Sequence, residues 1–353
     1  MNPSEKSSGP VGQASIGLKT PADGLESVSV VIPCYNEESF IGKALENLAD
    51  QYDNECYEIV VVDGLSKDRT REAIAQFQER RPEVVIRVLD NPARHIPTAL
   101  NIGVASARGE IVARMDAHAV PSSGYVRRCV EVLRENEWGV VGMPCHVRPG
   151  ANTLLARAIA IAVSHPFGIG NAKYRLQEGK TQQESVDTVA FSCFRKKLWE
   201  ELGGFNEELL TNEDYDFNYR VRLRGGTVLL DRAEHCDYFA RATLRSLSGQ
   251  YFRYGQWKAR MLMLHPRSIR SRHLVAPMFV ASIVLLLLLG LFWPTAWWVL
   301  GLELLAYFSL ALVLSWQRGH GEADRLLLTL LLPLVFLTIH LSWGVSFFLG
   351  LVR

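Results

Sequence analysis

A carboxylate and an imidazole stand two residues apart at Asp116 and His118, directly after the apolar run at Ile111 and Val112. In extended backbone, side chains at positions i and i+2 point to the same side. We therefore expect Asp116 and His118 to face outward together from the end of a strand, where open α/β sheets bind their ligands. One oxygen ligand and one nitrogen ligand make half of a metal site.

Two further polar clusters follow apolar runs that have the character of buried strands. Residues 33–37 follow the run at 28–32, and residues 63–68 follow the run at 59–62. The sheet edge at which these strands end should therefore carry several carboxylates. Neither GxGxxG nor GxxxxGK[ST] occurs in the sequence, which excludes the usual dinucleotide and P-loop phosphate sites.

Carboxylates at a sheet edge need cations or hydrogen-bond donors as ligands. The base and ribose of a nucleotide offer NH and OH groups to Asp63 and Asp68, and a divalent metal on Asp116 can neutralise a diphosphate. His118 could instead be a strand-end histidine that is hydrogen-bonded to the backbone.

The segments around these clusters alternate between strands and helices. The predicted strands are 28–32, 59–62, 84–89 and 110–115, and the predicted helices are 40–50, 69–80, 98–107 and 125–134. This alternation predicts βαβ units, hence an α/β domain with a Rossmann-like, mainly parallel sheet. Beyond Asp116 the pattern loosens, with strands at 139–147, 186–194 and 227–230 and helices at 153–163, 196–202 and 212–224. We expect the loop 168–183 to shape an acceptor site.

The C-terminal part of the chain is largely apolar. Three spans, at 274–292, 295–315 and 326–349, are each near the ~20 residues that cross a hydrocarbon core. Basic residues precede the first span and follow the second, so the positive-inside rule places the preceding domain in the cytoplasm and the C-terminus outside. Glu303, inside the second span, is expected to face another helix.

The distribution of charged residues and of cysteines helps to divide the chain into segments. The formal net charge of +1 gives no indication of nucleic acid, but residues 241–273 hold eight Lys and Arg and no acid. The six cysteines show no CxxC pair, which is typical of reduced cysteines in a cytoplasmic compartment. We predict a flexible tail at 1–26, a catalytic domain at 27–240, a basic amphipathic interfacial segment at 241–273 and a membrane region at 274–353.

The motifs together resemble those of the family 2 glycosyltransferases, which have the GT-A fold. The resemblance covers roughly residues 28 to 235. The matching pieces, in the family's order, are Val-Ile-Pro-Cys-Tyr-Asn-Glu at 31–37, Val-Val-Asp-Gly-Leu-Ser-Lys-Asp at 61–68, Leu-Asn-Ile-Gly at 100–103, an Asp-x-His variant of Asp-x-Asp at 116–118, Gly-Gly-Phe-Asn-Glu at 203–207 and Asn-Glu-Asp at 212–214.

The resemblance implies a nucleotide-sugar site and a divalent metal, Mn²⁺ or Mg²⁺. The residues that would bind the UDP-sugar are Pro33, Tyr35, Asn36, Glu37, Asp63, Asp68, Asn101 and Asp116. Asp116 and His118 would hold the metal, with His118 at the position of the usual second Asp. Because imidazole suits Mn²⁺ better than Mg²⁺, this departure favours Mn²⁺.

Asp214 matches the catalytic base of the family, with Glu213 beside it. An inverting transfer needs a carboxylate opposite the leaving UDP to take the proton of the acceptor hydroxyl. The alternative is that both acids only stabilise a helix N-terminus, where negative charge is favourable.

The segment after residue 240 lies where a lipid acceptor would arrive. Gln250, Arg253 and Tyr254 resemble the Gln-x-x-Arg-Trp motif of processive polysaccharide synthases, and Arg253 and Lys258 are candidate contacts for a lipid diphosphate. The simpler interpretation is a basic amphipathic segment at the membrane surface. His235 could be a further metal or phosphate ligand, or a packing residue.

The sequence thus predicts an inverting, multi-pass glycosyltransferase of the cytoplasmic membrane that moves a hexose, with glucose as first candidate, from a UDP-sugar to a lipid-linked saccharide in exopolysaccharide synthesis. Expected partners are the UDP-sugar, a polyprenyl diphosphate saccharide, membrane lipids and other polysaccharide-assembly proteins. The alternatives are a polyprenyl-phosphate sugar transferase, a processive synthase, and a non-catalytic nucleotide-binding subunit of an assembly complex.

Overall fold

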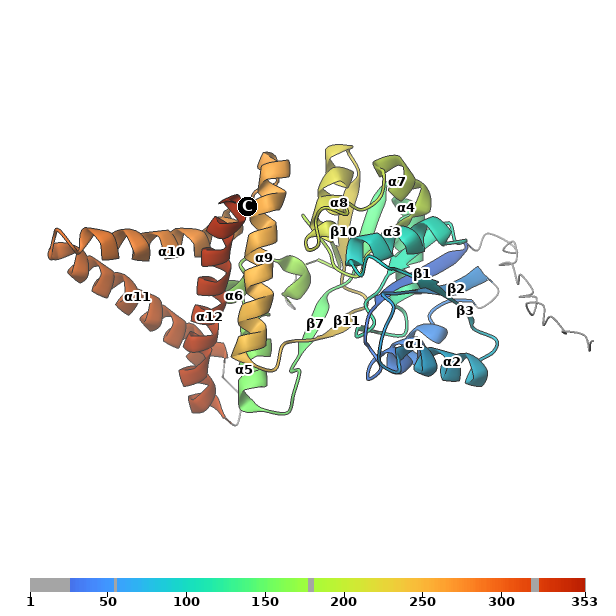
Figure 1. Ribbon diagram of the computed structural model, residues 1–353, viewed down its shortest axis with the longest axis horizontal. Helices are drawn as coiled ribbons and strands as arrows, with labels where there is room; N and C mark the ends of the chain where they lie inside the picture. The colour runs from blue at the N-terminus through green and yellow to red at the C-terminus, as the bar shows by residue number, and fades with distance from the viewer. Residues whose placement is uncertain (1–25, 54–55, 177–180, 319–323, 353) are drawn as a thin grey trace, which may run out of the picture.

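An eight-stranded sheet forms the centre of the catalytic half of the molecule (Figure 1). The computed structural model describes residues 26–53, 56–176, 181–318 and 324–352. The strand order is β3-β2-β1-β4-β9-β6-β10-β8. The bounds are β1 Val28–Cys34, β2 Tyr57–Asp63, β3 Val85–Asp90, β4 Ile111–Arg114, β6 Gly139–Gly142, β8 Gln183–Ser185, β9 Cys193–Arg195 and β10 Thr227–Asp231.

Four parallel strands make the first half of this sheet, as the βαβ pattern predicts. The chain builds outward from β1 to β2 and β3, and then returns to place β4 on the other side of β1. The strand order therefore reverses between β1 and β4, and the carboxyl ends of these two strands border a crevice. Residues 35–37 and 115–118, which follow β1 and β4, are brought to this crevice.

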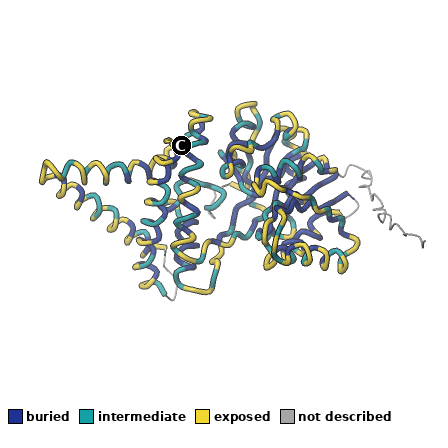
Figure 2. Tube along the Cα trace, viewed as in Figure 1, coloured by how far each residue is buried: buried dark blue, intermediate teal, exposed yellow. Residues whose placement is uncertain are grey.

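Helices cover both faces of the sheet. α1 Ile41–Ala49, α2 Thr70–Arg80 and α4 Tyr125–Glu135 pack on one face, and α3 Ile96–Ser106, α7 Lys196–Leu202 and α8 Glu213–Leu223 pack on the other. Along β1, Val30 and Ile32 belong to one core and Val31 to the other, and all three are fully buried. Burial of both faces explains why these strands are continuous apolar runs without alternation. Figure 2 shows this buried sheet between more exposed helices.

The second half of the domain differs from the sequence prediction in two places. The expected strand 139–147 is two strands, β6 in the large sheet and β7 Cys145–Arg148 in a second sheet of order β5-β11-β7, with β5 Val120–Pro121 and β11 Cys236–Phe239. The expected strand 186–194 contributes only β9, which runs antiparallel to both β4 and β6. Apolar content predicted burial correctly at both places, but hydrogen-bonding partners were decided by tertiary contacts.

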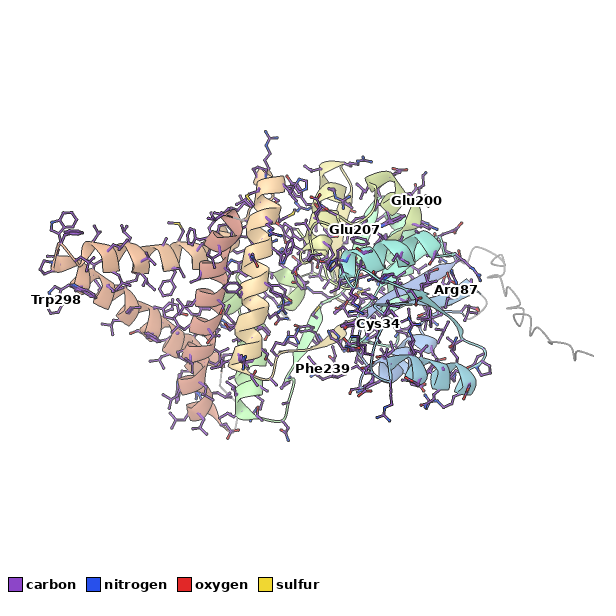
Figure 3. The ribbon with its side chains drawn as sticks, viewed as in Figure 1. Cys34, Arg87, Glu200, Glu207, Phe239 and Trp298 are labelled. Carbon is purple, nitrogen blue, oxygen red and sulfur yellow. The ribbon has the colours of Figure 1, made fainter. Side chains whose placement is uncertain are left out.

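The C-terminal half is helical. α9 Leu244–Leu264 packs along α12 Arg325–Val352, and α5 Leu154–Ala162 and α6 Pro166–Ile169 also contact α12. α10 Ser271–Leu289 and α11 Thr295–Arg318 form a hairpin that projects away from the sheet domain, with Trp298 near its tip (Figure 3). α10, α11 and α12 are long and apolar enough to cross a membrane, with mean hydropathies of 2.1, 1.9 and 2.1.

Exposure within the hairpin fits a lipid environment. Trp298 and Phe292 are 82% and 75% exposed, which is costly in water and favourable in hydrocarbon. Ser282 on α10 donates a hydrogen bond of 2.6 Å to Glu303 on α11. Glu303 therefore faces another helix, as predicted.

The predicted tail at 1–26 lies outside the described residues except for Glu26. Its carboxylate is paired with Arg195 at 2.6 Å and with Arg134 at 3.3 Å. All six cysteines are buried.

Two glycines test how tightly the helices pack on the sheet. A Cβ at Gly103 of α3 would lie 2.3 Å from Val31 Cγ1 and 3.0 Å from Val62 Cγ2, whereas a Cβ at Gly42 of α1 would meet nothing within 4 Å. We expect Gly103→Ala to destabilise the protein by about 1–3 kcal/mol through overpacking. The matched control Gly42→Ala should stabilise it by about 0.5–1 kcal/mol. Thermal unfolding followed by circular dichroism measures both, and equal melting temperatures would contradict the close approach of α3.

Candidate active site

A cavity of about 580 Å³ lies between the carboxyl edge of the sheet and the C-terminal helices. Asp116, His118, Glu213 and Asp214 line the sheet side of the cavity. Of the residues predicted for the acceptor side, Gln250, Arg253, Tyr254 and Lys258 line it from α9. The structure therefore joins the predicted metal motif, the predicted base and the predicted acceptor segment around one space.

Arg114 connects the two acidic motifs of this cavity. The guanidinium, at the end of β4, is 2.9 Å from Asp116 Oδ1 and 3.6 Å from Glu213 Oε1, and the side chain is buried. Nearby carboxylates raise the pKa of Arg114, so it stays charged in spite of its burial. Arg114 thus holds the carboxylate after β4 beside the start of α8.

His118 is held by the loop that follows β1. Its Nδ1 lies 3.4 Å from Glu37 Oε1, and the hydrogen bond to Glu37 raises the pKa of the imidazole against the effect of burial. The contact joins the carboxyl ends of β1 and β4 across the reversal of strand order. It also directs Nδ1 to Glu37, so Nε2 is the nitrogen available to another ligand.

The loops after β1 and β2 are tied to each other by hydrogen bonds. The Asn36 N–H donates to Ser66 Oγ at 2.8 Å, and Asn36 Oδ1 accepts from the Lys67 N–H at 2.8 Å. Asp68 Oδ2 accepts from the Glu38 N–H at 3.1 Å. Asn36 has a φ of 54°, a left-handed conformation that Asn tolerates better than most residues. Asn36 and Asp68 therefore shape the loops.

Four more residues that the sequence predicts to bind the nucleotide also lie outside the lining of the cavity: Pro33, Tyr35, Asp63 and Asn101. Asp63 is fully buried and accepts from Arg71 Nε at 2.6 Å. The Asn101 amide donates to the Phe205 carbonyl oxygen at 2.9 Å and to Glu207 at 2.8 Å, which fixes the Gly-Gly-Phe-Asn-Glu loop. Neither Pro33 nor Tyr35 lines the cavity, and the side chain of Tyr35 is 40% exposed. Their contact with a nucleotide stays a prediction.

The helix α8 begins with two carboxyl groups in different surroundings. Glu213 is buried, and burial together with the neighbouring Asp214 raises its pKa to about 8. Asp214 is half-buried and accepts a hydrogen bond of 2.7 Å from the Tyr215 N–H. Next along the helix, Asp216 is paired with Arg220 at 2.7 Å, and its other carboxylate oxygen lies 2.9 Å from Nε2 of His265. Burial therefore favours the protonated form of Glu213, and Asp214 is the acid of this pair that is partly exposed at the cavity.

Gln250, Tyr254 and Lys258 recur every four residues and so share one face of α9. Gln250 Nε2 donates to the hydroxyls of Tyr238 at 3.0 Å and Tyr254 at 3.1 Å. Arg253 is exposed at the mouth of the cavity. This part of α9 faces the active-site cavity, while the prediction that the segment 241–273 lies at a membrane surface stays a prediction.

Sequence reasoning missed Arg114, Arg175 and Arg272, which also line the cavity. Arg114 stands two residues before Asp116, so strand periodicity could have placed both on one face. Arg175 lies in the predicted acceptor loop 168–183, in the short 3₁₀ turn η2 Lys173–Arg175.

His235 has a different neighbourhood from the one predicted for a catalytic ligand. Its ring stacks on His146 at a centroid distance of 4.1 Å, and Asp237 completes a group with metal-binding atoms within 4.8 Å of one another. None of these three residues is among those that line the cavity. Arg148 donates to Asp237 Oδ1 at 3.0 Å, so the carboxylate already has a cation.

The mainly parallel sheet, the reversal between β1 and β4 and the acidic groups at its carboxyl edge define a glycosyltransferase of the GT-A fold. The mannosyltransferase PcManGT from Pyrobaculum calidifontis, solved in complex with GDP-Man and Mn2+, shares this fold. Its TM-score is 0.58 at 19% identity, over 92% of this chain and 91% of that chain.

The family follows from the sequence matches. Residues 29–203 match the model of Glycosyl transferase family 2, and the chain belongs to this family. The succinoglycan biosynthesis protein ExoA of Rhizobium meliloti (strain 1021) is 29% identical over 266 residues, 74% of this chain and 78% of that protein. The dolichyl N-acetyl-alpha-D-glucosaminyl phosphate 3-beta-D-2,3-diacetamido-2,3-dideoxy-beta-D-glucuronosyltransferase of Methanococcus voltae is 26% identical over 67% of this chain and 74% of that protein. The family predicted from the sequence motifs is confirmed. Within the family, the Asp-Ala-His-Ala motif at 116–119 and the apolar C-terminal spans also predict a similarity to ExoA, a membrane-associated glucosyltransferase, and the match confirms this similarity.

The raised pKa of Glu213 predicts a pH-dependent stability. The folded protein binds the Glu213 proton more tightly than the unfolded chain, so this contribution to stability is complete below pH 4.5 and is lost as the pH rises towards about 8. The Glu213→Gln variant has no ionisable group at this position, so it does not lose this stability as the pH rises. We expect the stability of the variant relative to the parent to increase from pH 5 to pH 8, by at most about 1.4 kcal/mol for each pH unit.

Thermal unfolding in detergent across this pH range measures the difference. The control Glu200→Gln, at an exposed position on α7 (Figure 3), should show no comparable trend. A difference that stays constant with pH would mean that Glu213 is ionised in the folded protein.

Proposed function

We propose that the chain is a membrane-anchored, inverting glycosyltransferase that moves a hexose, with glucose as first candidate, from a UDP-sugar to a lipid-linked saccharide in exopolysaccharide synthesis. The observation that carries the proposal is the shared cavity. It is lined by Asp214 and by Asp116 and His118 on one side, and by the apolar helices α10 and α12 on the other. A water-soluble donor and a lipid-borne acceptor can meet only in a space of this kind.

In the proposed reaction Asp214 accepts the proton of the acceptor hydroxyl as its oxygen attacks the anomeric carbon. A new carbon–oxygen bond forms, the bond to the diphosphate breaks, and UDP leaves with the electron pair. Inversion of a UDP-α-sugar gives a β-linked product. Glu213, whose protonated form is favoured by burial, adds little negative charge beside Asp214. Arg114 holds Asp116 and Glu213 and so positions the base relative to the donor side.

The residues at the carboxyl edge fit a divalent metal. Asp116 offers a carboxylate oxygen and His118 offers Nε2, a mixed donor set that suits Mn²⁺ better than Mg²⁺. A metal bound there would neutralise the diphosphate of the donor and the departing UDP. Support comes from the presence of Mn2+ in the mannosyltransferase of the same fold.

The acceptor side of the proposal rests on the helices. α10, α11 and α12 anchor the enzyme in the cytoplasmic membrane, with the sheet domain in the cytoplasm as the basic residues before α10 indicate. Anchoring confines the search for a lipid acceptor to two dimensions and so raises its effective concentration. The name of the Methanococcus voltae relative likewise describes transfer to a dolichyl-linked sugar.

The proposed base is tested by Asp214→Asn. We expect transfer of labelled sugar from UDP-sugar to membrane lipid to fall by about 10²–10⁴-fold, while UDP binding is retained. The control Asp50→Asn changes an exposed carboxylate that is paired with Arg81, far from the cavity lining, and should retain activity. Unchanged transfer by Asp214→Asn would refute the catalytic proposal and favour a non-catalytic nucleotide-binding subunit.

The proposed metal ligand is tested by substitution of His118. His118→Ala should raise the Mn²⁺ concentration for half-maximal activity about 10- to 100-fold. His118→Asp should keep activity and shift the preference towards Mg²⁺, because it replaces nitrogen by a hard oxygen ligand. The control His95→Ala alters an exposed histidine. Identical metal dependence in all three variants would show that His118 is not a ligand.

A further inference from the structure

The acceptor end of the cavity contains a guanidinium without a counter-ion. Arg175 lies in η2, and its Cζ is 5.5 Å from the centre of the Tyr174 ring and 5.2 Å from that of Tyr238. Its Nε is buried and has no hydrogen-bond partner. Within the described part of the chain, no carboxylate oxygen is paired with Arg175 at 4 Å or less.

A second basic residue of the cavity also lacks a counter-ion within the described part of the chain. Lys258 of α9 is 5% exposed, and its Nζ lies 3.3 Å from the centre of the Tyr215 ring. Among the described residues it has no ion-pair partner within 4 Å, and burial lowers its pKa to about 7. By contrast, two other arginines of the cavity are compensated, Arg114 by Asp116 at 2.9 Å and Arg272 by Asp187 at 2.5 Å.

Uncompensated buried cations are costly, because aromatic faces replace only part of the lost hydration. Arg175 is partly buried and Lys258 is buried, and neither has a carboxylate within 4 Å in the described part of the chain. Two such basic groups in one cavity, beside two arginines that are paired, indicate a site that is completed by an anion from outside the protein. Phosphate oxygens are the strongest partners for guanidinium and ammonium groups.

The surroundings indicate what the phosphate is attached to. The cavity is also lined by apolar and aromatic side chains of the three apolar helices, namely Val275, Ala276 and Phe279 of α10, Tyr307 of α11 and Ile339 of α12. These helices are the apolar ones that could cross a membrane. A ligand that has its phosphate at the cations can therefore extend an apolar chain along this wall.

We propose that Arg175 and Lys258 bind the diphosphate that joins the saccharide acceptor to its lipid. The proposal rests on the proposed function and deepens it: the acceptor is a diphosphate-linked lipid rather than a neutral glycolipid or a free polysaccharide. The two cations anchor the lipid diphosphate, and the saccharide then extends towards Asp214. Among the described residues of the loop 168–183, Arg175 is the one that we assign to the acceptor.

The test measures binding, so it does not depend on turnover. The full-length protein in a nonionic detergent is saturated with UDP and Mn²⁺ to fill the donor side and is then titrated with farnesyl diphosphate. Arg175→Gln and Lys258→Gln should each weaken this binding tenfold or more. Arg245→Gln, which removes an exposed charge from α9 outside the cavity lining, is the matched control and should bind as the parent does.

Three further measurements distinguish binding of a lipid diphosphate from binding of the UDP diphosphate, and test whether the charge of Arg175 is needed. The affinity of Arg175→Gln for UDP should stay within about twofold of that of the parent. Arg175→Lys should recover part of the affinity for farnesyl diphosphate. Farnesol, which has no phosphate, should bind to the parent and to Arg175→Gln with equal affinity. The melting temperature of Arg175→Gln should not fall, because a buried unpaired charge is removed.

Two results would overturn the proposal. An equal loss of UDP affinity would assign Arg175 to the donor, and unchanged affinity for farnesyl diphosphate in both variants would remove the site. A failure of the proposed function would instead show as absent sugar transfer by the parent protein, whatever the binding results.

Discussion

The arrangement of this active site depends on one buried cation. Arg114 ends the strand β4 and contacts the carboxylates of Asp116 and Glu213, which belong to segments almost 100 residues apart in the chain. Burial of a guanidinium is costly unless a carboxylate neutralises it, and Asp116 lies 2.9 Å from Arg114. The same interaction therefore stabilises Arg114, fixes the metal motif, and brings the start of α8 with Asp214 to the carboxyl edge of the sheet.

The reversal of strand order supplies the frame for this interaction. Because β4 returns to the free side of β1, the loops after both strands border one crevice, and Glu37 reaches His118 across it. The loop after β2 contributes by holding the loop after β1 in place, through Asn36 and Asp68. Among the residues that the sequence motifs assign to the nucleotide, Asp116 therefore lines the cavity, whereas Asn36 and Asp68 shape the loops at its border.

Charge is distributed unequally around the cavity. On the sheet side, the guanidinium of Arg114 is matched by carboxylates, and burial favours the protonated form of Glu213. On the helical side, Arg175 and Lys258 have aromatic rings for neighbours and, among the described residues, no carboxylate within 4 Å. This asymmetry separates a donor side suited to a metal from an acceptor side suited to phosphate, and the apolar helices continue the acceptor side towards the membrane.

The sequence by itself determined the α/β class, the first four strands with their helices, the three apolar spans and the family, because each depends on local periodicity or on motifs of adjacent residues. It also identified Asp116, His118, Glu213 and Asp214, which do line one cavity. Only the tertiary structure decided that β7 leaves the main sheet, that Asn101 is engaged by Phe205 and Glu207, and that Arg175 belongs to the site. These features depend on which distant segments meet and on whether a charge finds a partner there, and neither is encoded in local spacing.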